Sequence, residues 1–133
     1  SARINELLWD ETTGFYYDHA IDGGLAKLKT HCGFLPLFAQ VAPTERAERL
    51  LEHLQDESEF WTPLPVPSVS RDDATYSKDM WRGPTWLNYN YFIIEGLHNY
   101  GFAEAANALT ERTLNEVVRW YLKEGVIFEY YDA

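Results

Sequence analysis

The chain has 133 residues, the length of one domain or of part of one. Apolar residues make up 46% of it and aromatic residues 16%, which allows a packed core and excludes a disordered chain. The formal charge of −10 argues against nucleic acid and anionic membranes as partners. An acidic, aromatic-rich chain suits a neutral ligand such as a sugar, although solubility alone also accounts for the charge.

The single cysteine, Cys32, excludes an intrachain disulfide framework. Its neighbour His31 has no second His or Cys cluster at metal-ligand spacing, so we expect both residues to be structural, with no metal and no other cofactor. No apolar run reaches membrane-spanning length. No signal peptide is recognisable at the N-terminus, which together with the single cysteine favours a cytoplasmic location.

The first predicted element is the end of a helix. Ile4, Leu7 and Leu8 share one face at helical spacing, but no capping residue precedes them, which suggests a chain cut from something longer. Residues 10–14 are predicted as a turn and residues 15–18 as a short extended piece that ends before a Gly-Gly pair.

Two helical segments are predicted next. Residues 33–41 hold an apolar stretch in which Pro36 fits the first turn of a short helix. A cleaner helix opens at Thr44, because its apolar residues follow the i, i+3, i+4, i+7 pattern, at Ala47, Leu50, Leu51 and Leu54. Residues 62–85 then form a long connection whose aromatic content is poor for disorder, so we expect an ordered loop that lines a site.

Two more helices are predicted after this connection. Pro84 suits the first position of a helix that ends near Gly101, and its apolar surface predicts burial on most sides. An amphipathic helix follows from about Ala103 to Lys123, with a predicted inner face of Ala106, Leu109, Thr113, Val117, Trp120 and Tyr121. These two helices and the preceding pair are predicted as two α/α hairpins. The expected fold class is therefore all-α, as part of a helical toroid with inner and outer rings.

The densest set of functional side chains precedes the buried helix. Trp81, Arg82 and Trp86 stand around its start, where free backbone N–H groups, a guanidinium and flat apolar rings are available. A sugar needs an apolar face to stack on and directed hydrogen bonds to its hydroxyls. For each residue alone, a role in the core or in an ion pair is about as probable, but the set as a whole favours a site.

Glu129 is a second candidate. It lies in an extended piece after the last helix, between Phe128 and Tyr130. A carboxylate among aromatic residues can position and activate a water. The alternative is an exposed glutamate on a strand whose aromatic neighbours point inward.

Four segments resemble glycoside hydrolase family 63 and its mannosylglycerate-hydrolase-like and trehalase-like relatives, in family order. Residues 80–90, MWRGPTWLNYN, are similar to the W-R-G-P-x-W-x-N-x-N segment, and residues 67–73, PSVSRDD, to the stretch before it. Residues 8–18, LWDETTGFYYD, resemble an upstream stretch, and residues 128–132, FEYYD, the terminal motif with the family's general base. Together these matches span nearly the whole chain.

The resemblance implies a six-hairpin (α/α)6 toroid and an inverting glycoside hydrolase that acts on a carbohydrate without a cofactor. Carried over onto this sequence, Glu129 is the general base. The residues expected to bind substrate are Trp81, Arg82, Gly83, Trp86, Asn88, Tyr17 and Asp73. The family's general acid lies in an earlier part of the barrel, and Asp72, Asp73 and Asp79 lie outside that motif. Residues 1–133 are therefore expected to form a single domain, the C-terminal part of a larger barrel.

Because the chain is expected to hold the general base of the catalytic pair without the general acid, the isolated chain is expected to have little activity. An incomplete ring leaves helix faces exposed, to be covered by the rest of the barrel or by self-association. One alternative is a non-catalytic carbohydrate-binding or accessory module that keeps the aromatic residues. A terpene-cyclase-like toroid, suggested by Asp72 and Asp73, is disfavoured because that chemistry needs an acidic Mg²⁺ motif on a helix, and this pair lies in a Pro/Ser loop.

Overall fold

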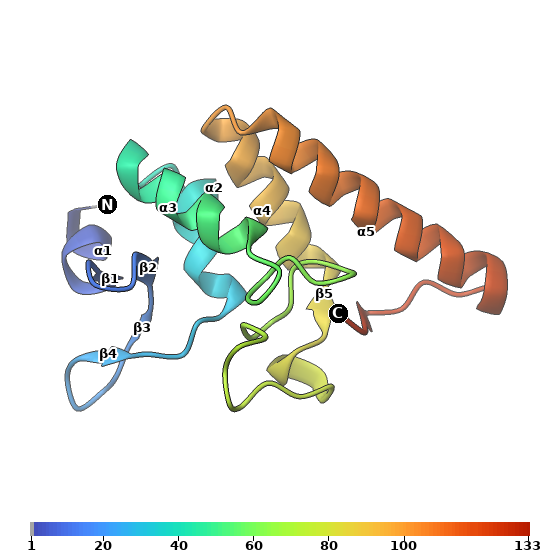
Figure 1. The fold of residues 1–133 in the computed structure, drawn as a ribbon, viewed down its shortest axis with the longest axis horizontal. Helices are drawn as coiled ribbons and strands as arrows, with labels where there is room; N and C mark the ends of the chain where they lie inside the picture. Colours follow the sequence, from blue (N-terminus) through green and yellow to red (C-terminus); the bar gives the residue numbers. More distant parts are fainter. Residues whose placement is uncertain (1) are drawn as a thin grey trace.

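The computed structural model describes residues 2–133, and helices account for about 48% of the chain. Figure 1 shows the helices gathered along one side and the loops below them. In chain order the described elements are α1 (Ala2–Leu7), β1 (Trp9–Asp10), β2 (Phe15–Tyr16), β3 (Asp18–His19), β4 (Leu25–Ala26), η1 (His31–Phe34), α2 (Leu35–Phe38), α3 (Thr44–Gln55), η2 (Met80–Arg82), β5 (Thr85–Trp86), α4 (Leu87–Asn99), α5 (Ala103–Glu124) and β6 (Tyr130–Tyr131).

The strands form small antiparallel sheets of two strands each: β1 with β2, β3 with β4, and β5 with β6. Helices therefore dominate as predicted, but the β3–β4 hairpin is an addition to the prediction. Gly23 and Gly24 close that hairpin with φ angles of 93° and 96°, which few other residues adopt. The β5–β6 pair joins the two distant segments that carry the candidate site.

The centre of the core is Phe15, which is fully buried. Its ring lies edge-on to Phe34 at a centroid distance of 5.4 Å and stacks on Phe60 at 5.7 Å. Gly33 allows this packing, because a Cβ there would lie 2.2 Å from the Phe15 ring. Leu50 and Leu54 complete the core from the predicted apolar face of α3, whose start at Thr44 is confirmed.

A buried ionic network ties α3 to the loop that follows it. Glu59 accepts hydrogen bonds from the Lys29 ammonium and from His53 Nδ1, the latter at 2.7 Å, while His53 Nε2 lies 2.9 Å from the Thr13 carbonyl oxygen. Burial alone would raise the pKa of Glu59, but the hydrogen bonds from His53 and Lys29 outweigh it and the pKa lies below its ordinary value. The network thus holds an ionised carboxylate at the edge of the core.

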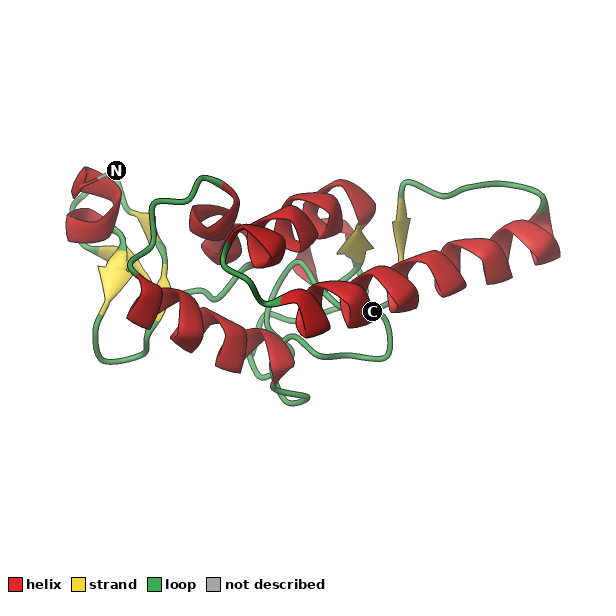
Figure 2. Cartoon of the chain, turned by 90° about the horizontal axis from the view of Figure 1, so that it is seen from above, coloured by secondary structure: helices red, strands yellow, loops and turns green. Residues whose placement is uncertain are grey.

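The predicted hairpin of two long helices is confirmed in α4 and α5, which pack side by side (Figures 1 and 2). Gly101, with φ 78°, lies in the turn between them. On the other side α4 packs against α2, and Gly96 permits this contact because a Cβ there would lie 2.7 Å from the Phe38 backbone nitrogen. Within the described residues 2–133, no helix combines the length and apolarity needed to cross a membrane.

Three details differ from the prediction. Helix α4 begins at Leu87 rather than Pro84, because residues 85–86 pair with β6 as a strand. The first helix of the first predicted hairpin is shorter than predicted, because α2 ends after four residues, before Gln40 at φ 52°. The inner face of α5 is buried at Ala106 and Leu109 only, because the second half of the helix extends past α4 (Figure 2), which leaves Tyr121 exposed.

Candidate functional site

The long connection between α3 and α4 is ordered, as predicted. Ser68 and Ser70 are buried, and the Ser68 hydroxyl accepts a hydrogen bond from the Gly83 N–H at 2.9 Å. Asn90 of α4 fixes the loop further, since its side chain donates to the Pro65 carbonyl at 2.7 Å and accepts from the Val66 N–H at 3.1 Å. The loop is therefore a rigid support for the residues just before α4.

Three aromatic rings form a stack, which we call the tryptophan platform: Trp81 of η2, and Trp86 and Tyr130, which pair across β5 and β6. The indoles of Trp81 and Trp86 are parallel within 3° at a centroid distance of 3.6 Å, and the Tyr130 ring lies 5.0 Å from Trp86. Trp86 is 4% exposed and donates its indole N–H to the Met80 carbonyl at 3.2 Å. Trp81 is 48% exposed, so it supplies the accessible indole of the platform.

A second aromatic pair lies against the platform. The His31 imidazole stacks on Tyr89 at 3.6 Å, and the Trp81 ring stands edge-on to both, at 6.0 and 6.1 Å. Burial lowers the pKa of His31 to about 3, so the imidazole is neutral near pH 7. Its Nδ1 is buried and has no hydrogen-bond partner among the described residues, 2–133. Sequence reasoning treated His31 as structural and passed over Tyr89, although both stand beside predicted site residues.

Glu129 comes immediately before β6. The pairing of Trp86 with Tyr130 places Glu129 at the level of Leu87, the first residue of α4. Its side chain is exposed and has no hydrogen bond or ion pair to any residue in the 2–133 range. The strand pairing thus places the backbone of Glu129 one residue from Tyr130 of the tryptophan platform, and its carboxylate has no partner among residues 2–133.

The remaining residues of the motif before α4 have different surroundings. The Arg82 side chain is exposed, and its backbone carbonyl accepts a hydrogen bond from the Ser77 N–H at 2.8 Å. Gly83 is buried, and a Cβ there would lie 2.0 Å from the Ser77 carbonyl oxygen, so the close approach of these two segments requires glycine. Asp73 accepts hydrogen bonds from the N–H and hydroxyl of Thr75, at 2.8 and 2.6 Å.

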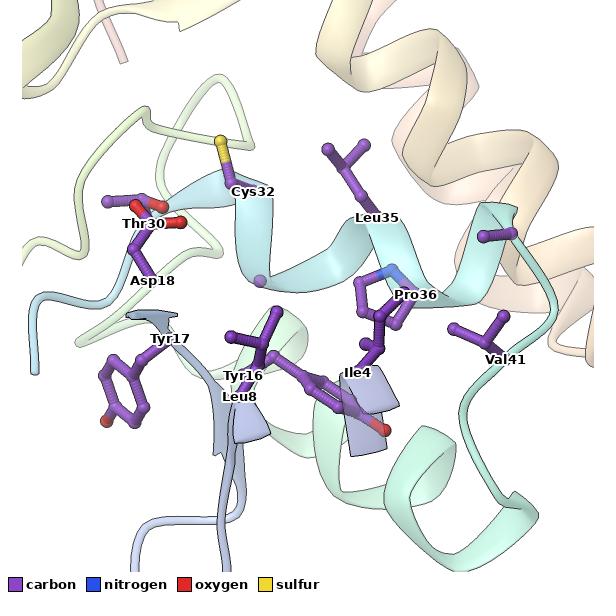
Figure 3. Close-up of a pocket in the computed structure, with 12 residues that line it drawn as sticks. Ile4, Leu8, Tyr16, Tyr17, Asp18, Thr30, Cys32, Leu35, Pro36 and Val41 are labelled. Carbon is purple, nitrogen blue, oxygen red and sulfur yellow. The ribbon is translucent and has the colours of Figure 1, made fainter. Parts of the chain in front are cut away.

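Tyr17 belongs to a separate, mostly apolar pocket of about 350 Å³ between the N-terminal elements and α2 (Figure 3). Asp18 and Thr30 stand at one end of it, and Val41 at the other. Cys32 links this pocket to the platform, because its thiol lies 3.8 Å from the hydroxyl of Tyr89. The structure therefore groups Tyr17 with Cys32 rather than with the tryptophans.

Asn88 faces another cavity, of about 340 Å³, between α2 and α4. Leu35 and Ala39 of the α2 region line both this cavity and the Tyr17 pocket, so α2 is the partition between them. Over residues 2–133, no three side chains of His, Cys, Asp or Glu gather in a way that could hold a metal ion. The candidate site residues are aromatic rings, the Glu129 carboxylate and hydrogen-bonding groups.

The chain is similar to known glycoside hydrolases in sequence and in fold. The chain is 38% identical over 138 residues to mannosylglycerate hydrolase MGH1 of Selaginella moellendorffii, covering 98% of this chain and 27% of that protein. The structure of the GH63 mannosylglycerate hydrolase from Thermus thermophilus in complex with glucose is similar with a TM-score of 0.79 and 34% identity, over 94% of this chain and 31% of that one.

Neutral trehalase Nth1 from Saccharomyces cerevisiae shares the fold, with a TM-score of 0.85 at 22% identity, over 98% of this chain and 25% of that one. The first curated relatives are much longer, since this chain spans 24 to 30% of their lengths. The family described as mannosylglycerate hydrolase MGH1-like glycoside hydrolase domain matches residues 1–133. The chain therefore belongs to the MGH1-like family of glycoside hydrolases.

Proposed function

We propose that this chain is part of an inverting glycoside hydrolase that cleaves α-glycosidic bonds of small glucosides or mannosides, with Glu129 as the general base. The observation that supports the proposal is the β5–β6 pairing, which places the backbone of Glu129 directly beside Tyr130 of the tryptophan platform. A sugar stacked on Trp81 would lie beside a free carboxylate. The names of the relatives suggest mannosylglycerate as the first substrate to test.

The substrate-binding residues are proposed to act in two ways. Trp81 offers the stacking face, Trp86 and Gly83 hold it in place from behind, and the exposed Arg82 guanidinium offers hydrogen-bond donors to sugar hydroxyls. Asn88, Tyr17 and Asp73 stand farther from the platform in the fold, at the two cavities and in the loop. We propose that they contact more distant parts of the substrate.

The chemistry requires a second carboxyl group. In an inverting mechanism one carboxylic acid protonates the leaving oxygen while the base removes a proton from the attacking water, across a gap of roughly 6.5–9.5 Å. The acids of the long loop are poorly suited: Asp72 accepts a hydrogen bond from Ser70 at 2.6 Å, and Asp73 is held by Thr75. We propose that the acid belongs to another part of the intact polypeptide.

The exposed face of α5 supports the same view. Leu114, Val118, Tyr121 and Leu122 recur at helical spacing and are 53 to 80% exposed. Such a stripe on a helix needs a partner. We propose that residues 1–133 form the C-terminal part of a larger (α/α)6 domain, whose remaining helices cover this stripe; self-association through the same face is the alternative.

The direct test compares the intact polypeptide with the isolated 133-residue chain. Turnover of mannosylglycerate, whose leaving group is poor, should be at least about 10²-fold lower for the isolated chain, because general acid–base catalysis typically contributes 10²–10⁴-fold. Proton NMR of the fresh product should show the β-anomer, the mark of inversion. An α-anomer formed first, or robust turnover by the isolated chain, would refute the proposal.

A carbohydrate-binding module without catalysis is the second candidate, favoured by the half-exposed Trp81 and by the hydrogen bonds that hold Asp72 and Asp73. The same experiment separates the two functions. A module would bind methyl α-mannoside or methyl α-glucoside in calorimetry, and the intact polypeptide would leave every glycoside uncleaved.

Replacing Trp81 by Ala should weaken the binding of methyl α-mannoside to the intact polypeptide by roughly tenfold, because the accessible face of the platform is lost. The melting temperature should change little, since Trp81 is half exposed. Isothermal titration calorimetry and a thermal melt measure the two quantities. Trp86→Ala should instead lower the melting temperature, because that ring is buried between two others.

The matched control is Tyr91→Ala, which removes an exposed aromatic ring from α4 at a position outside the platform. It should leave sugar binding unchanged. If Trp81→Ala unfolds the protein, or binds the sugar as well as the unaltered protein does, the ring belongs to the core and the platform is not a sugar site.

A further inference from the structure

Glu129 has no side-chain partner among residues 2–133, so its position depends on the backbone that carries it. That backbone lies in an exposed segment: Val126, Ile127, Phe128 and Tyr130 are 38 to 65% exposed. An exposed segment of this kind samples many conformations unless something fixes it, and each additional conformation dilutes the productive one. A group that holds this turn would therefore control where the carboxylate lies.

Tyr131 is the buried residue of this segment, with 3% of its surface exposed. It pairs with Thr85 in the β5–β6 sheet, and Thr85 in turn donates its hydroxyl to the Leu64 carbonyl at 2.8 Å. Tyr131 is therefore anchored to the same rigid loop that supports the tryptophan platform.

The hydroxyl of Tyr131 closes the turn around Glu129. It accepts a hydrogen bond from the backbone N–H of Phe128 at 3.1 Å, so Glu129 and Tyr130 lie between the two bonded residues. The rings add a second constraint: Phe128 stands edge-on to Tyr131 at 5.9 Å and to Trp120 of α5 at 5.8 Å. The residue before Glu129 is thus held from both sides.

Trp120 is itself fixed, because its indole N–H donates to the Glu116 carboxylate at 2.8 Å. A continuous set of contacts therefore runs from α5 through Trp120 and Phe128 to Tyr131. The phenol hydroxyl is the polar contact in this set that bears directly on the backbone next to Glu129.

We infer that Tyr131 is the positioning residue for Glu129, through the hydrogen bond between its hydroxyl and the Phe128 amide. The inference rests on the proposed role of Glu129 as the general base and adds a residue to it. Tyr131 does not contact substrate; it sets the direction from which the Glu129 carboxylate reaches the attacking water. Its loss should therefore affect the chemical step more than substrate binding.

Tyr131→Phe in the intact polypeptide keeps the ring and deletes only the hydroxyl. The kcat for mannosylglycerate should fall roughly tenfold with KM nearly unchanged, because a shift of about 1 Å in a catalytic group costs up to about 10²-fold. Hydrogen exchange of the peptide that contains Phe128 should become faster, because the amide loses its acceptor. Tyr91→Phe, which deletes an exposed hydroxyl on α4 outside the platform, is the matched control and should change neither quantity.

The double variant Tyr131→Phe/Glu129→Gln separates this inference from the proposed function. Its kcat should equal that of Glu129→Gln alone, because a hydroxyl that positions the carboxylate has no effect once the carboxylate is gone. Additive losses, or unchanged kcat in Tyr131→Phe, would overturn the positioning role while leaving Glu129 as the base. Normal turnover by Glu129→Gln would remove the proposed function and this inference with it.

Discussion

Replacing Glu129 by Gln in the intact polypeptide should lower kcat by about 10²–10⁴-fold while substrate binding survives. Glutamine keeps the shape of the side chain but cannot accept the proton of the attacking water. Because the Glu129 side chain is exposed and has no partner among residues 2–133, the substitution breaks no contact seen in the structure. Steady-state kinetics on mannosylglycerate and calorimetry with the same substrate measure the two effects.

A glycosyl fluoride of the inverted anomer provides a second readout of the same variant. With an added acceptor alcohol, an enzyme that has lost only its base should still convert this compound. The acceptor oxygen attacks the anomeric carbon, its proton passes to the second carboxyl group in its ionised form, and fluoride ion leaves from the face that normally holds the water. Glu95→Gln, at an exposed acid of α4, is the control and should retain normal kcat. Near-normal turnover by Glu129→Gln would mean that another carboxylate activates the water.

Replacing Phe15 by Ala should destabilise the chain by about 3–5 kcal/mol, the range for a large buried aromatic ring. Phe15 is fully buried, and its ring contacts Phe34, Phe60 and His53 at centroid distances of 5.3 to 5.7 Å. The cavity cannot close easily, because these neighbours come from three separate segments. Urea unfolding followed by circular dichroism measures the change in the free energy of unfolding.

Tyr91→Ala serves as the control for this experiment, because it removes an exposed aromatic ring from α4. A surface substitution of this kind is expected to change the free energy of unfolding by about 0.5 kcal/mol or less. A loss below about 1 kcal/mol for Phe15→Ala, well short of the range for a large buried ring, would show that Phe15 is not the centre of the core.

Local sequence patterns predicted the longer helices, because a helix forms its backbone hydrogen bonds within one segment of the chain. The spacing of apolar residues predicted the start of α3 at Thr44. The same kind of spacing, together with Gly101 as the point where a helix ends, predicted the α4–α5 hairpin. The start of α4 was misplaced at Pro84, because residues 85–86 find a partner strand at residues 130–131. No local pattern reports a partner that far along the chain.

The candidate site was predicted in part for the same reason. The motif residues before α4 and the segment around Glu129 were both singled out, yet their meeting depends on the β5–β6 pairing. Burial of His31 against Tyr89 also required the fold, since a lone histidine followed by cysteine has no distinctive spacing. The buried length of α5 was overestimated, because amphipathic spacing shows which face is apolar but not how far a neighbouring helix extends along it.

Gly96 has a consequence for how binding volume could change over evolution. At this position a single hydrogen atom separates α4 from the backbone of α2, and α2 is the partition between two apolar cavities. A methyl group at residue 96 would clash with the backbone of α2 and displace α2 away from α4. The cavity beside Asn88 would widen while the pocket beside Tyr17 narrowed. One small residue therefore couples the sizes of two spaces whose lining residues could otherwise vary independently.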